Sequence, residues 1–171
     1  MAKRLILTRH AKSSWDFSGP DHERPLNPRG YLAAPKIGQW MRDHSYLPDQ
    51  ILSSSARRTV ETCEGLGFDI EVNFLKTLYH ASARTILETL QSATGDTVLM
   101  VGHNPGYADF AQKIVKAPPA HDRFYDYPTC ATTVVDFAIS NWDELGFGLG
   151  HCVDFIVPRD ISDATERGAL T

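Results

Sequence analysis

Two short, continuously apolar segments constrain the fold of this chain more than any other feature of its sequence. They are Arg4–Thr8, with the sequence RLILT, and Thr97–Val101, with the sequence TVLMV. A strand that is apolar on both faces is typical of the centre of a parallel sheet with helices on both sides. These two segments therefore predict the central strands of an α/β fold.

Segments with helical spacing alternate with the predicted strands. Tyr31–His44 predicts a helix, in which Pro35 fits only within the first turn. The other predicted helices are Ala56–Leu66, Ala83–Gln91 with Ser82 as its N-cap, and Gly106–Val115. The other predicted strands are Gln50–Ser53, Ile70–Phe74, Thr132–Ala138 and Cys152–Val157, and the predicted loops are Asp16–Arg29 and Ala117–Pro128. This alternation predicts a three-layer α/β/α sandwich with a mostly parallel central sheet.

The length of 171 residues fits one domain spanning residues 1–171. The net charge of -4 gives no basic surface of the kind that binds nucleic acid, so a positive field for an anionic ligand has to be local. No apolar stretch approaches the length of a membrane span, and we expect no membrane partner.

Cysteine usage and the N-terminal segment bear on the compartment. Cys63, Cys130 and Cys152 are odd in number, far apart and without a C-x-x-C pair, which favours reduced thiols over a disulfide framework or a zinc site. The apolar run in MAKRLILTRH is too short for a secretory signal and has no small-residue cleavage site. We therefore expect a cytoplasmic protein.

Polar residues follow three of the predicted strands directly. Arg9–His10 follows the first strand, Ser53–Ser54 ends the second, and Gly102–Asn104 follows the Thr97–Val101 strand. Active sites of parallel α/β folds lie beyond the carboxyl ends of the strands. We therefore expect these three groups to meet at one edge of the sheet.

Two histidines and two adjacent arginines at that edge suit a phosphoryl group. The guanidinium groups of Arg57 and Arg58 offer planar donors for phosphate oxygens, although one of the two is expected to face solvent. A neutral imidazole is a competent nucleophile toward phosphorus, and cationic neighbours would keep His10 neutral near pH 7. The same cations would stabilise the charge of the transferring group.

Four segments together carry a family resemblance. LTRHAKSSWD, ERPLNPRG, SSSARRTVET and VGHNPG, in this order and spacing, resemble the histidine phosphatase superfamily, with its phosphoglycerate mutase-like fold, and its SixA-type phosphohistidine phosphatase branch. The resemblance extends from the first strand to at least Gly106. Ala11 stands where glycine is commoner in R-H-G, a variant that fits the SixA-like branch.

The resemblance implies a role for each residue that matches a motif. His10 matches the phosphorylated nucleophile, Arg9 a phosphate ligand, and His103 the second catalytic histidine. The pattern S-x-x-x-R-x-x-x-T matches Ser54, Arg58 and Thr62, so Arg58 is the preferred second arginine. Arg57 is kept as the alternative.

The remaining polar residues near these motifs leave alternatives open. Lys12 and Ser13 either bind phosphate or form a polar loop, and Asn104 is a candidate substrate ligand. For Arg24 and Asn27 we favour a structural role in the R-P-L-N turn. A metal site at His10 and His103 is disfavoured, because no carboxylates stand beside them in the sequence, and no cofactor is expected.

No carboxylic acid matches the proton donor of the larger family members. Asp16 is the first candidate, with Asp21 and Glu23 in the same loop and His80 further along the chain. Alternatively no acid is needed, because imidazole leaves from phosphohistidine more easily than an alkoxide leaves from an ester. The lack of a long insertion after the second strand favours an open cleft suited to a protein substrate.

These arguments predict a metal-independent phosphatase that works through phospho-His10 and removes phosphate from phosphohistidine on a protein, releasing inorganic phosphate. A broad small-molecule phosphomonoesterase or mutase, acting on a small phosphate substrate, is the first alternative. A weakly catalytic phosphoryl-binding module is the second.

Overall fold

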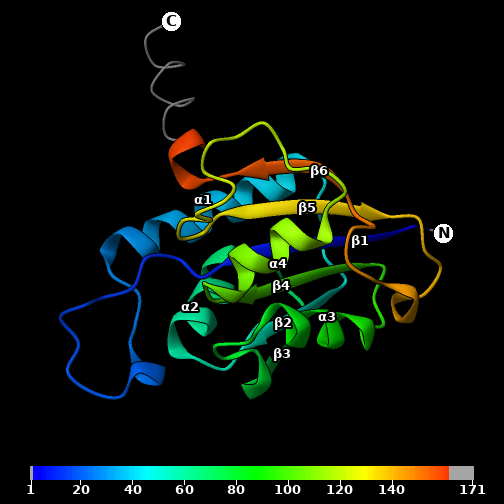
Figure 1. Cartoon of the computed structure of the whole chain (residues 1–171). Coiled ribbons are helices and arrows are strands. Elements are labelled where there is room, and N and C mark those ends of the chain that lie inside the picture. The colour runs from blue at the N-terminus through cyan, green and yellow to red at the C-terminus, as the bar shows by residue number, and fades with distance from the viewer. Residues whose placement is uncertain (1, 162–171) are drawn as a thin grey trace, which may run out of the picture.

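The computed structural model describes residues 2–161, which form a six-stranded mixed sheet between two layers of helices (Figure 1). The strand order is β3-β2-β4-β1-β5-β6. The strands are β1 (Lys3–Arg9), β2 (Gln50–Ser54), β3 (Val72–Leu75), β4 (Thr97–Gly102), β5 (Thr132–Phe137) and β6 (His151–Ile156). Among these strands only β5 runs against the rest, so the prediction of a mostly parallel sheet is confirmed.

Alternate residues of β1 enter two separate cores. Leu5 and Leu7 pack with buried side chains of α3 (Ala83–Gln91) and α4 (Gly106–Ile114). Ile6 packs on the other face with α1 (Pro28–Asp43) and α2 (Arg57–Leu66). Successive side chains of a strand point to opposite faces, and a strand covered on both faces must be apolar throughout. β1 is therefore continuously apolar because helices cover both of its faces, as the sequence predicts. The prediction of three layers is confirmed.

The first helix begins earlier than predicted, and the placement of Pro35 in a first turn is wrong. Asn27 caps α1 by accepting a hydrogen bond from the Gly30 backbone N–H, and Pro28 occupies the first turn. Proline is favourable there because the first helical N–H groups have no partner within the helix. Pro35 consequently lies inside α1, and the predicted loop Asp16–Arg29 is interrupted by this helix start and by a short 3-10 turn, η1 (Asp21–Glu23).

The parallel strands bring three chain segments to one edge of the sheet. Arg9 at the end of β1 lies opposite Gly102 at the end of β4, and Ser53 of β2 lies opposite Val101. The strands β1, β2 and β4 therefore end at nearly the same height in the sheet, and the residues that follow them lie at one edge, as the sequence predicts. No helix among residues 2–161 has both the length and the apolar character of a membrane span.

Two glycines allow backbone segments to approach this edge closely. A Cβ on Gly106, at the start of α4, would collide with the carbonyl oxygen of Ala81. A Cβ on Gly30, in α1, would collide with the carbonyl oxygen of Lys12. Only glycine fits such contacts without a backbone shift. Gly106 in this way keeps the His80–Ala81 segment against the turn that follows β4.

We predict that Gly106→Ala lowers the free energy of unfolding by about 1–3 kcal/mol, because the added methyl group meets a backbone oxygen that cannot move freely. Gly146→Ala is the matched control, since its Cβ would have its nearest neighbour at 3.8 Å, and its effect should stay within about 0.5 kcal/mol. Urea denaturation of both variants measures the difference. Equal stability of the two variants would contradict the close approach at Gly106.

Candidate active site

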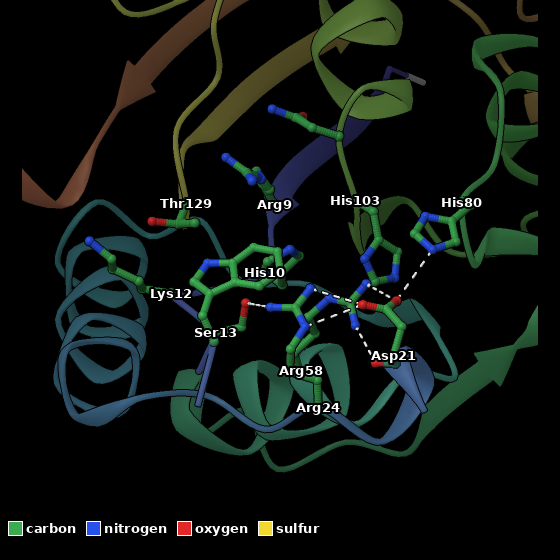
Figure 2. A pocket seen from close by; sticks show the side chains of 12 residues that line it. Arg9, His10, Lys12, Ser13, Asp21, Arg24, Arg58, His80, His103 and Thr129 are labelled. Atoms are coloured by element: carbon green, nitrogen blue, oxygen red, sulfur yellow. Dashed lines mark hydrogen bonds and ion pairs between the residues drawn. The ribbon is translucent and has the colours of Figure 1, made fainter. Parts of the chain in front are cut away.

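A cavity of about 420 Å³ lies at the edge of the sheet where β1, β2 and β4 end (Figure 2). Its walls come from the loop that follows β1, from η1, from α2 and from the turn after β4, together with the segments that contain His80 and Thr129. The residues that line it are Arg9, His10, Lys12, Ser13, Trp15, Asp21, Arg24, Arg58, His80, His103, Asn104 and Thr129. Segments far apart in the sequence therefore meet in one pocket.

His10 is buried, and its ring has a defined orientation. Its Nδ1 lies 2.6 Å from the carbonyl oxygen of Ala11. Because a carbonyl oxygen only accepts, Nδ1 carries the proton, and the lone pair of the neutral ring is on Nε2. Burial, followed by the charges of Arg9, Arg58 and Arg24, lowers the pKa of His10 to about 3. The imidazole is therefore neutral and nucleophilic at pH 7.

Backbone contacts hold the His10 turn from three sides. The His10 N–H donates to the carbonyl of Gly102 at 2.9 Å, and the His10 carbonyl accepts from the Cys130 N–H at 3.0 Å. The Ala11 N–H donates to Oγ1 of Thr62 at 2.9 Å. Thr62 in turn donates to the carbonyl of Arg58. The threonine of the S-x-x-x-R-x-x-x-T pattern thus links the turn after β1 to α2.

His103 lies beside His10, with 5.3 Å between the ring centroids. Its Nε2 is 2.8 Å from Oγ of Ser54, which orients the ring, and its buried Nδ1 has no hydrogen-bond partner. Burial lowers the pKa of His103 to about 2, assisted by the proximity of His10 and Arg58. Two neutral imidazoles therefore face the same cavity.

Arg58 is buried, and Asp21 binds it in two ways. Arg58 donates through Nη1 to the Asp21 backbone carbonyl at 2.9 Å and through Nη2 to Oδ2 at 3.0 Å. Oδ1 of Asp21 accepts from Arg24 at 3.1 and 3.2 Å, and Arg24 also donates to Ser13. Asp21 thereby fixes the orientation of two guanidinium groups that line the pocket (Figure 2).

Asp21 also contacts the far wall of the pocket. Tyr79 donates its hydroxyl proton to Oδ2 at 2.5 Å, and Nε2 of His80 lies 3.4 Å from the same oxygen. Burial alone would raise the pKa of Asp21, but the hydrogen bond from Tyr79 and the charges of Arg58 and Arg24 outweigh it and lower the pKa. Asp21 is therefore a carboxylate at neutral pH, which accepts hydrogen bonds and has no proton to give.

The structure brings together most of the residues that the sequence singled out. Arg58 lines the pocket, whereas Arg57 is exposed. Nε of Arg57 lies 3.7 Å from Oε2 of Glu61. His80 also lines the pocket, while Asp16 is exposed and is not among the lining residues. Asn104 lines it as well, but its Nδ2 donates to the backbone carbonyls of residues 126 and 127.

Some pocket residues were missed or misinterpreted from the sequence. Arg24, interpreted as part of a structural turn, is buried and lines the cavity, and so do Trp15 and Thr129. Asp21 was only one of several acidic residues in its loop. The role of Asp21 depends on its contact with Arg58, which lies far away in the chain. The sequence holds no pattern that indicates this contact.

The pocket concentrates positive charge in a chain of net charge -4. Four cationic side chains line it against the single carboxylate of Asp21: Arg9, Lys12, Arg24 and Arg58. Nε of Arg9, Nε of Arg58 and Nδ1 of His103 are buried without a partner. Guanidinium groups bind anions with several oxygens through charge-assisted hydrogen bonds, so the cationic lining of the pocket fits such an anion. Within residues 2–161, no group of three or more His, Cys, Asp or Glu side chains is arranged to hold a metal ion.

Comparison with known proteins gives matches over most of the chain. Residues 5–80 match the model of the histidine phosphatase superfamily, branch 1. The Mycobacterium tuberculosis protein Rv1276c is 33% identical over 159 residues, which are 88% of this chain and 99% of that protein.

Two solved structures of candidate phosphohistidine phosphatases named SixA share the fold. The protein from Nakamurella multipartitia is 28% identical with a TM-score of 0.83, covering 92% of this chain and 97% of that one. The protein from Agrobacterium tumefaciens is 29% identical with a TM-score of 0.75, covering 91% and 98%. With these matches, and with the pocket in which His10 and His103 meet Arg9 and Arg58, the chain belongs to the histidine phosphatase superfamily.

Proposed function

We propose that this protein is a metal-independent phosphatase that removes phosphate from phosphohistidine on a protein through a phospho-His10 intermediate. The observation that carries the proposal is the state of His10. Its Nδ1–H is donated to Ala11, its pKa is about 3, and Arg9 and Arg58 line the same pocket. A neutral imidazole with a free Nε2 beside cationic phosphate ligands is equipped for nucleophilic attack on phosphorus.

The proposed first step transfers the phosphoryl group from one imidazole to another. Nε2 of His10 attacks phosphorus, the substrate P–N bond breaks, and its electron pair stays on the substrate nitrogen. A substrate ring that carries a proton on its other nitrogen leaves as neutral imidazole and needs no further acid. The new phospho-His10 ring keeps its Nδ1 proton, which it donates in a hydrogen bond to the Ala11 carbonyl oxygen. Arg9, Arg58 and His103 stabilise the oxygens of the transferring group.

Water completes the reaction in the second step. It attacks phosphorus, the P–Nε2 bond breaks, and its electron pair returns to Nε2, so that His10 becomes neutral again. Both protons of the attacking water leave with the product as dihydrogen phosphate, which can then lose one of them to solvent. Splitting the hydrolysis in this way replaces one difficult displacement by two easier ones.

Two observations support phosphohistidine as the substrate class, namely the ionised state of Asp21 and the solved relatives. Asp21 is ionised and tied to Arg58 and Arg24, so the carboxyl group in the pocket offers no proton to a poor leaving group. His80 is then the remaining candidate acid among the lining residues that were singled out in the sequence. The solved relatives from Nakamurella multipartitia and Agrobacterium tumefaciens are candidate phosphohistidine phosphatases.

We predict that a radiolabelled phosphodonor labels the wild-type protein on His10 and that the label is then released to water. His10→Ala should trap no label and should lower kcat by on the order of 10³-fold or more, because the attacking atom is lost. His151→Ala, at an exposed position on β6, is the control and should behave as wild type. Turnover that survives in His10→Ala would exclude the mechanism.

Dependence of the activity on a bisphosphate primer would favour a mutase. Label that is never released from His10 would favour a binding module.

The lack of a resting carboxylic acid predicts a preference among leaving groups. kcat/KM for a phosphohistidine peptide should exceed that for an alkyl phosphate by at least about 100-fold, the usual contribution of general acid catalysis to a step that needs it. Steady-state phosphate release with both substrates measures the ratio. Equal efficiency on the two substrates would identify a broad phosphomonoesterase instead.

The neutral state of His10 predicts a loss of stability in acid. Its pKa is about 3 in the folded chain and about 6.5 when unfolded, so between these values the unfolded chain binds the extra proton. The free energy of unfolding should therefore fall by about 1.4 kcal/mol for each pH unit below 6.5 on account of His10. Urea denaturation between pH 7 and pH 5 measures the slope. His10→Asn should reduce the slope by about that amount while His151→Asn should not, and equal slopes in all three proteins would refute the neutral assignment.

A further inference from the structure

Trp15 is the most exposed of the large apolar side chains among residues 2–161, and it also lines the pocket. Its exposed fraction is 81%. An aromatic side chain of this size normally contributes to a core or an interface, and leaving it in water forgoes that burial. The mechanism proposed above assigns no role to it. Its location at the edge of the cavity makes a ligand the natural partner for the exposed ring.

One face of the indole rests on a fixed support. The guanidinium carbon of Arg24 lies over the Trp15 ring, 4.1 Å from its centroid. Arg24 is itself held by Asp21 and by Ser13. A cation placed over an indole face at this distance is attracted to it, and this contact orients the ring.

The backbone on either side of this contact is also fixed. The Ser14 N–H donates to the carbonyl of Pro25, and the Asn27 N–H donates to the carbonyl of Lys12, both at 2.9 Å. These bonds tie the segment before Trp15 to the segment that follows Arg24. The indole is therefore a preorganised platform with one face on Arg24 and much of its surface open.

We propose that Trp15 is a specificity-determining residue whose open indole face stacks on the imidazole ring of the phosphohistidine substrate. The proposal rests on the function proposed above. In phosphohistidine the ring is bonded directly to phosphorus, so phosphorus at His10 would keep the ring within the cavity, whose lining includes both His10 and Trp15. A phosphoserine or sugar phosphate places an oxygen and an aliphatic carbon there instead. Protonation of the substrate ring strengthens its attraction to the indole.

Two donors with the same P–N bond separate stacking from catalysis. One is a phosphohistidine peptide, and the other is phosphoramidate, which has no ring. In Trp15→Ala the ratio of kcat/KM for the peptide to kcat/KM for phosphoramidate should fall about tenfold, mainly through KM for the peptide. Trp15→Phe should restore most of the ratio because it keeps an aromatic face, and Trp15→Leu should not. Phe74→Ala removes an exposed aromatic ring outside this pocket and should leave the ratio at the wild-type value.

The outcomes distinguish this proposal from the one on which it rests. If wild type hydrolyses both donors and Trp15→Ala lowers both equally, Trp15 only supports Arg24 and the stacking role is overturned. The same holds if Trp15→Leu restores the ratio as well as Trp15→Phe does. If wild type hydrolyses neither donor, the proposed function fails first. A reduced ratio that only the aromatic replacement restores establishes the stacking role.

Discussion

The parallel pairing of β1 with β4 is the constraint on which the site depends. It places Arg9 opposite Gly102, so the two residues that follow, His10 and His103, leave neighbouring strands at the same level. The His10 N–H also donates to the Gly102 carbonyl, which continues the pairing beyond the strands. Both strands are buried by helices on each face, and interiors packed at this density deform little. The distance of 5.3 Å between the two imidazole rings is thus set by the sheet.

Charge is the second feature that organises this edge of the molecule. Arg58 is 2% exposed, and the cost of burying its guanidinium is met in part by Asp21. The same carboxylate orients Arg24, which in turn supports Trp15. One acidic side chain thereby connects three groups that line the pocket. Burial keeps His10 neutral, and the remaining cationic field adds to this effect, so the groups that would bind an anion also help to prepare the nucleophile.

The sequence and the structure agree best where a residue is placed by a regular element. The strand and helix periods predicted the layers. The family pattern S-x-x-x-R-x-x-x-T favoured Arg58 over Arg57, and in α2 Arg58 is buried while Arg57 is exposed. Agreement is poorest in the segment between β1 and α1. There the sequence favoured Asp16 as a candidate acid and a structural role for Arg24, whereas the structure has Asp16 exposed and Arg24 in the pocket. A loop has no period from which the direction of a side chain can be inferred.

The sequence by itself determined which residues reach the edge of the sheet. Continuous apolar strands must be central, and the groups directly after them, Arg9, His10 and His103, must then emerge at their carboxyl ends. Only the tertiary structure decided how far burial lowers the pKa of His10, the pairing of Asp21 with Arg58 and Arg24, and the open face of Trp15. The physical reason is that these properties arise from burial and from contacts between segments far apart in the chain. No local pattern of side chains encodes them.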